Sequence, residues 1–111
     1  MKKVLLLAAL AAFGAGASTT YTKEQLNDMD RMGQYPEQEP PVTKGVESVD
    51  FAKCKNDAGG IYSQVSGNYP AKELVNSGIL YVVKIWTNDG AIMISCSEPD
   101  GKKVITQSSY K

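Results

Sequence analysis

Apolar and polar residues alternate most clearly in the last third of the chain. Residues 79–87, 91–98 and 102–109 follow this pattern and are rich in β-branched and aromatic side chains, which favour strands. An Asn-Asp-Gly sequence at 88–90 and a Pro-Asp-Gly sequence at 99–101 separate the runs, and both are typical of turns. The pattern therefore predicts an antiparallel meander of three strands.

Turn length predicts the register of this meander. A two-residue loop at 89–90 would pair Val83 with Cys96, and a three-residue loop at 99–101 would place Val104 beside Cys96. Side chains on one face of the sheet then form the core. The opposite face carries Leu80, Val82, Lys84, Trp86, Met93, Ser95 and Ile105.

Two segments upstream of the meander have the periodicity of helices. Thr22 and Gln25 form a capping-box pattern at the start of a short amphipathic helix over 23–32. Asp50 is a good N-cap for a second helix, in which apolar residues recur at helical spacing through residue 66. The glycine pair at 59–60 interrupts that helix, because each glycine costs about 1 kcal/mol relative to alanine.

Three other segments have weaker patterns. The proline-rich stretch 34–41 is predicted as an extended tether between the helices. Residues 46–49 fit a short edge strand. Residues 70–76 fit either a helical turn or a short strand that forms a hairpin with the next one, and the pattern leaves both open.

The N-terminus has the three parts of an export signal. Lys2 and Lys3 are followed by a short apolar run at 4–13 and by the small-residue sequence Ala-Gly-Ala at 15–17. The run is shorter than the roughly 20 apolar residues that span a bilayer. We therefore expect residues 1–17 to be a signal peptide and the mature protein to be periplasmic or secreted. No cysteine follows the cleavage site, so we expect no lipid anchor.

Cys54 and Cys96 are the only cysteines of the chain. An even number of cysteines in an exported protein indicates a disulfide. In the predicted register Cys96 points into the core, and Cys54 lies on the apolar stripe of the second helix. The cysteines lack Cys-x-x-Cys spacing, and two thiolates without histidine make a poor zinc site. The prediction is a structural disulfide between helix and sheet.

Composition narrows the function classes. The chain has no histidine, which removes the commonest general base and metal ligand and lowers the expectation of an enzyme. Without Lys2 and Lys3 it has 10 basic and 12 acidic residues, a net charge of −2, so we expect no nucleic-acid partner. No motif indicates a cofactor or a metal.

The predicted fold is α+β, with two helices packed on a three- to four-stranded antiparallel meander and one disulfide. We divide the chain into a signal peptide (1–17), an N-terminal helix with its tether (18–45) and a disulfide-linked α+β domain (46–111). The leading hypothesis is a non-enzymatic protein that binds another envelope or secreted protein, as an inhibitor or accessory factor. The rival is a small-ligand carrier or histidine-free enzyme with a site at the helix–sheet seam.

The outward sheet face suggests where a partner could bind. In the predicted register Trp86 lies across from Met93, on a face that is apolar for a small protein. Either the helix at 23–32 folds over this face through Leu26 and Met29, or Trp86 anchors a protein-binding surface there, as tryptophan often does. Self-association through this face or an edge strand is a third hypothesis. The candidate interface residues are Trp86, Met93, Leu80, Val82 and Ile105.

Overall fold

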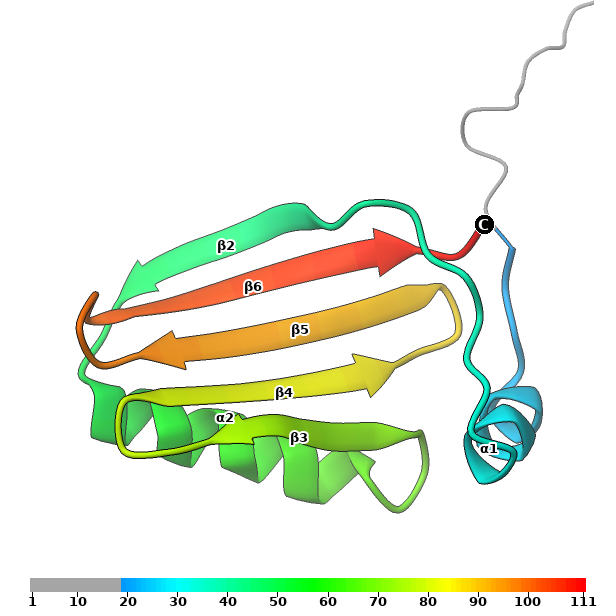
Figure 1. Cartoon of the computed structure of the whole chain (residues 1–111), viewed down its shortest axis with the longest axis horizontal. Helices are drawn as coiled ribbons and strands as arrows, with labels where there is room; N and C mark the ends of the chain where they lie inside the picture. The colour runs from blue at the N-terminus through cyan, green and yellow to red at the C-terminus, as the bar shows by residue number, and fades with distance from the viewer. Residues whose placement is uncertain (1–18) are drawn as a thin grey trace, which may run out of the picture.

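A computed structural model describes residues 19–111, and the predicted signal peptide lies outside them. The described chain forms a helix, a strand, a second helix and four further strands (Figure 1). The elements are α1 (Lys23–Arg31), β2 (Val42–Ser48), α2 (Phe51–Val65), β3 (Ala71–Asn76), β4 (Leu80–Trp86), β5 (Gly90–Ser97) and β6 (Lys102–Ser109).

The five strands form one antiparallel sheet in the order β2-β6-β5-β4-β3. The predicted α+β class is confirmed, with five strands in place of the expected three or four. β2 pairs with β6, the last strand of the chain, so β5 is the central strand. The segment that fitted either a turn of helix or a strand is strand β3. β2 begins directly after Pro41, earlier than the strand predicted at 46–49.

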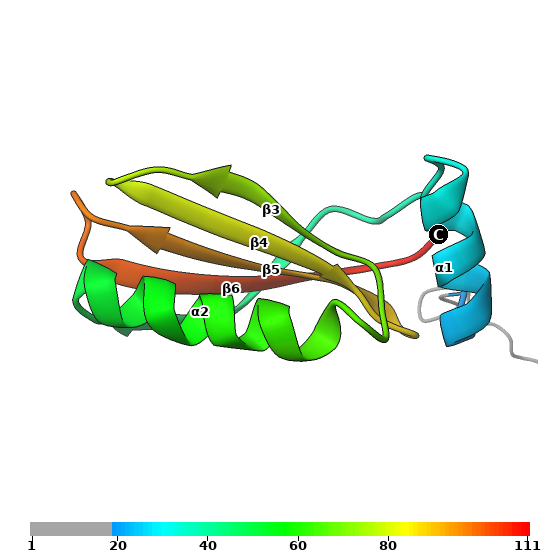
Figure 2. The ribbon, with the colours of Figure 1, turned by 90° about the horizontal axis from the view of Figure 1, so that it is seen from below.

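The two helices occupy different places around the sheet (Figures 1 and 2). Helix α2 lies across one face, which we call the covered face. Helix α1 packs beyond the strand ends, beside the C-terminus. No helix within residues 19–111 lies across the opposite face, which we call the outer face. The N-cap residues explain where the helices begin: Thr22 accepts from the Gln25 backbone N–H in a capping box, and Asp50 accepts from the Lys53 backbone N–H.

The β4–β5 hairpin is two residues out of the predicted register. Thr87 donates its backbone N–H to the Gly90 carbonyl at 2.9 Å, so the tight turn lies at residues 88–89. Val83 consequently pairs with Ile94, and Trp86 pairs with Ala91 rather than Met93. Because side chains alternate with a period of two, this shift leaves every residue on its predicted face.

The β5–β6 connection is one residue longer than predicted, and this error reverses the faces of β6. Ser97 pairs with Lys102, and Gly101 closes the turn at φ 61°, a conformation that favours glycine. Ile105 therefore pairs with Ile94 and packs against the core on the covered face. Its predicted place on the outer face is wrong, and Val104 and Thr106 lie there instead.

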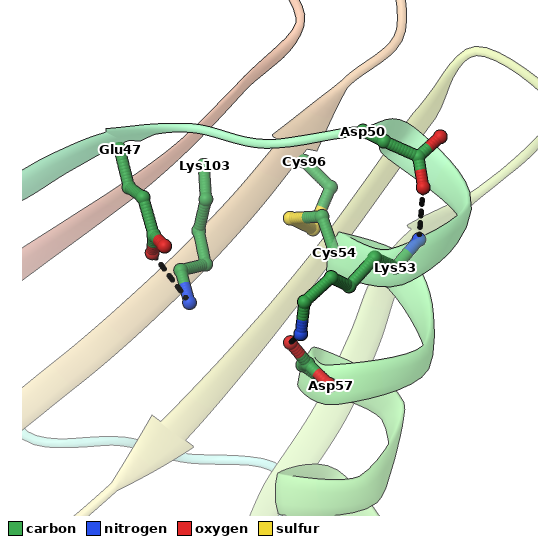
Figure 3. Close-up of a disulfide and its surroundings, with 7 residues drawn as sticks. All are labelled: Glu47, Asp50, Lys53, Cys54, Asp57, Cys96 and Lys103. Atoms are coloured by element: carbon green, nitrogen blue, oxygen red, sulfur yellow. Dashed lines mark hydrogen bonds and ion pairs between the residues drawn. A yellow bond between two sulfur atoms is a disulfide. The ribbon is translucent and has the colours of Figure 1, made fainter.

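The core on the covered face surrounds the predicted disulfide, which is confirmed (Figure 3). The bond joins the first turn of α2 to the central strand β5, with 5.8 Å between the two Cα atoms. Lys103 and Glu47 form an ion pair at 3.1 Å on the same face. The buried core residues are Cys54, Ala58, Tyr81, Val83, Ile94 and Cys96.

A second apolar cluster holds α1 against the end of the sheet. Leu26 of α1 is 1% exposed, and Trp86 is 4% exposed. The Tyr35 ring stacks on Trp86 with 4.3 Å between ring centroids. Trp86 is therefore covered by Tyr35 and the α1 segment and does not lie on an open surface. The buried residues of this cluster are Leu26, Trp86, Ala91 and Tyr110.

Reduction of the disulfide should lower the melting temperature by about 20 °C. The bond closes a separation of 42 residues, and a loop of that length stabilises a small domain by about 4 kcal/mol in the chain-entropy model. Calorimetry with and without dithiothreitol measures the effect. The double variant Cys54→Ala, Cys96→Ala is the control and should melt at the lower temperature in both buffers. Equal melting of oxidised and reduced wild type would contradict the prediction.

Leu26→Ala should lower the free energy of unfolding by about 2–5 kcal/mol, because it leaves a cavity beside Trp86. The matched control is Met32→Ala, which truncates a side chain that is 65% exposed and should change stability by less than about 0.5 kcal/mol. Urea unfolding followed by Trp86 fluorescence measures both. Similar effects of the two substitutions would show that α1 is not held by this cluster.

Candidate functional site

The outer face has large side chains along β4 and smaller ones along the central strand. Val82 is largely buried by its neighbours, whereas Leu80, Lys84 and Met93 are partly exposed. Of the predicted interface residues, Leu80, Val82 and Met93 thus share this face, Trp86 lies under Tyr35, and Ile105 is on the covered face. The outward residues of β5 are Ala91, Met93, Ser95 and Ser97, and their β6 partners are Ser108, Thr106, Val104 and Lys102. We call these eight residues the trough.

Two hollows lie in line along the trough. The first, of about 580 Å³, lies at the end near α1, where it is bounded by Lys84 and the tether. The second, of about 590 Å³, lies near the β5–β6 turn, where Leu80, Pro99 and Asp100 bound it. Each is within the range of about 300–1,000 Å³ that ligand sites commonly have. The lining residues of the first hollow are Gln38, Glu39, Pro40, Pro41, Lys84, Ala91, Met93, Thr106, Ser108 and Lys111.

The tether is fixed across the end of the sheet by backbone hydrogen bonds. Glu39 donates its N–H to the Ser109 carbonyl at 2.8 Å, and Lys111 donates its N–H to the Glu37 carbonyl at 2.9 Å. Gln38 also forms an isolated bridge with Tyr110. The tether runs past the ends of β6, β5 and β4 on its way to α1 (Figure 1). It therefore forms a fixed wall at the α1 end of the trough.

Lys84 is the central charge of this site. Its Nζ lies 5.1 Å from the centroid of the Trp86 ring, a favourable cation–π distance. Burial lowers the pKa of Lys84, because a partly desolvated ammonium is less favourable than a hydrated one. Among residues 19–111, no carboxylate lies within 4 Å of its Nζ, although Glu39 lines the same hollow. Lys84 is thus a partly buried cation whose charge the described side chains leave uncompensated.

A different groove lies at the seam between α2 and the edge strand β3. It has a volume of about 660 Å³ and is open to solvent, with Gly60 and Asn56 exposed along its helical wall. At its base Tyr81 donates a hydrogen bond to the Glu73 carboxylate. The Tyr81 hydroxyl lies 3.5 Å from the Cβ position of Gly59, so the glycine leaves room for this contact.

At the seam, the hydrogen bond between Tyr81 and Glu73 is a structural contact. Burial and the hydrogen bond to Glu73 raise the pKa of Tyr81 to about 12. A phenol with such a pKa stays protonated near neutral pH, which makes it a poor nucleophile and a poor base.

Two features of the outer face were missed by the sequence reasoning. The trough residues Val104 and Thr106 were assigned to the other face, because the turn at 98–101 is one residue longer than predicted. The tether was predicted, but no residue pattern showed that it would wall the trough. Lys84, in contrast, was placed on this face from the alternation alone.

Within residues 19–111, no three His, Cys, Asp or Glu side chains gather as a metal site would require. In the same range, no helix is both long enough and apolar enough to cross a membrane.

The raised pKa of Tyr81 predicts a loss of stability at alkaline pH. Its folded pKa is about 12 and its ordinary value is 10.0, so the unfolded chain releases this proton first. The stabilisation is therefore complete below pH 10 and is lost as the pH rises towards 12. Urea unfolding at several pH values should show Tyr81→Phe losing less stability than wild type across this window. Parallel curves for the two proteins would contradict this origin of the pH dependence.

Comparisons with protein-family models, curated protein sequences and solved structures find no match to this chain.

Proposed function

We propose that this chain is an exported, non-enzymatic protein that acts by binding another protein on the outer face of its sheet. The observation that carries the proposal is the contrast between the two faces. Helix α2 covers one of them, whereas the trough on the other has two hollows and a largely apolar lining at its α1 end. Open hollows that combine apolar and polar lining residues are typical of binding surfaces.

The disulfide supports an extracellular type of compartment. Disulfides persist where the environment is oxidising, as in the periplasm or outside the cell. A partner in that compartment would be another envelope or secreted protein, which fits an inhibitor or an accessory factor.

The proposed interface consists of residues that remain accessible on the outer face. Met93 and Lys84 lie opposite one another in neighbouring strands, at the first hollow. Leu80 and Val104 line the second hollow. The Trp86 ring is in cation–π contact with the Lys84 ammonium and is itself buried, so it would not contact a partner directly. The binding energy would come mainly from burying the apolar side chains, while Lys84 would add charge selectivity.

Met93→Asp should abolish capture of the partner while leaving the fold intact. The disulfide-bonded protein, recovered from an exporting host, is immobilised and exposed to an envelope extract of the cells that produce it. A charge at residue 93 would have to be desolvated in the complex, which is costly. Quantitative mass spectrometry of the captured proteins measures the loss, and circular dichroism checks the fold.

The matched control is Ile61→Asp, which places the same charge on α2, at a side chain that is 41% exposed. It should capture the partner as well as wild type does. Loss of capture with Ile61→Asp but not with Met93→Asp would move the binding surface to the helix. Equal capture by all three proteins would contradict the outer-face proposal.

A further inference from the structure

We propose that the trough binds an extended polypeptide segment by its C-terminal end, with the free terminal carboxylate paired to Lys84. This inference rests on the proposed function and adds the chemical identity of the bound segment. It depends on the dimensions of the trough, on the wall at its α1 end and on the uncompensated charge beside that wall.

The dimensions fit an extended chain. The trough follows β5 from Ala91 to Ser97, six residue steps at about 3.4 Å each, which gives about 20 Å. Three of the four outward β5 side chains are small, so the centre of the face is low relative to Leu80 and Lys84 on β4. An extended segment of about six residues would therefore lie along the trough and place alternate side chains in the two hollows.

The wall selects a chain end over a continuous chain. Pro40 and Pro41 line the first hollow, and hydrogen bonds from Glu39 and Lys111 fix the tether across the strand ends. A segment entering from the β5–β6 turn would meet this wall after about six residues. A chain that stops there avoids the wall, whereas a chain that continues must turn sharply away from the sheet.

The charge beside the wall selects the carboxyl end. Lys84 is partly buried, and no carboxylate among residues 19–111 lies within 4 Å of its Nζ. Glu39 and Lys111 line the same hollow, and Lys84 is the group there whose Nζ has no carboxylate within 4 Å among the described residues. At the other end of the trough, Lys102 and Asp100 balance one another. A terminal carboxylate is thus favoured near α1, and a terminal ammonium is disfavoured there.

The same charges argue against the competing occupants. A second copy of this chain placed face to face, with its trough running in the same direction, would bring the two Lys84 side chains to the same end of the interface, at a cost in repulsion. A fatty acid has the required carboxylate, but its tail favours an enclosed apolar cavity, whereas both hollows are open on one side. Binding of a fatty acid is therefore one outcome of the test.

The test uses a mixture of acetylated hexapeptides with Val, Leu, Ile or Phe at alternate positions and serine elsewhere. One preparation carries free carboxylates and the other carries C-terminal amides. Trp86 is the only tryptophan of the chain and lies under Lys84, so its fluorescence reports binding at this end of the trough. We expect the free acids to bind about tenfold more tightly than the amides, as for a charge-assisted hydrogen bond.

Variants of the full disulfide-bonded protein separate the charge effect from folding. Lys84→Met should remove the preference for the free acids, and Lys84→Arg should retain it. Lys55→Met is the matched control, because Lys55 lies on α2 with its Nζ 5.7 Å from the Tyr81 ring on the covered face. It should leave the preference unchanged.

Three results would overturn the inference: equal affinity for acids and amides, no binding of the free-acid mixture, or saturation by decanoate at concentrations where the peptides do not bind. None of them would decide the proposed function. Loss of partner capture in Met93→Asp would still support binding on the outer face, through a partner surface other than a chain end.

Discussion

The disulfide between Cys54 and Cys96 determines which face of the sheet is available. It joins the first turn of α2 to the central strand, so the helix is held over the middle of one face and cannot move to the other. Val83 and Ile94 pack beside the bond, and the paired Glu47 and Lys103 lie near it. A small domain has a modest core, and a constraint worth about 4 kcal/mol is a large part of its stability. The free outer face follows from this arrangement.

The second apolar cluster makes the two ends of the outer face different. Leu26 and Tyr35 bury Trp86 at one end of the sheet, and the indole in turn supports the ammonium of Lys84. Tyr110 of the same cluster forms a bridge with Gln38 of the tether, and its hydroxyl donates to the Thr87 carbonyl at 2.7 Å. The wall and Lys84 therefore lie at the same end of the trough, next to α1. The other end of the trough has no such wall, and its Lys102 and Asp100 balance one another, so the two ends of the trough differ.

Local patterns predicted the helices and the strands of the meander. The position of one turn and the length of the other, and with them the register of the strands, were predicted wrongly. The capping residues located both helices, and alternation placed Lys84 and Met93 on the outer face. An error of two residues at the β4–β5 turn preserved those faces, whereas one residue at the β5–β6 turn moved Ile105 to the core. The left-handed Gly101 that lengthens this turn fits several turn types, and sequence does not distinguish them. Docking of α1 on Trp86 through Leu26 was one of two alternatives for this face, and local periodicity does not distinguish between them.

The two edge strands of the sheet, β2 and β3, are poorly suited to binding a further strand. A free edge strand is the usual alternative site for adding another chain. Both edges of this sheet are interrupted: β2 has an irregularity between Thr43 and Gly45, and β3 has one between Glu73 and Val75. Such bulges break the regular spacing of donors and acceptors that an added strand needs. Exposed Lys72 on β3 adds a charge that further opposes edge pairing. With one face under α2 and both edges irregular, the trough remains the surface on which we propose that a partner binds.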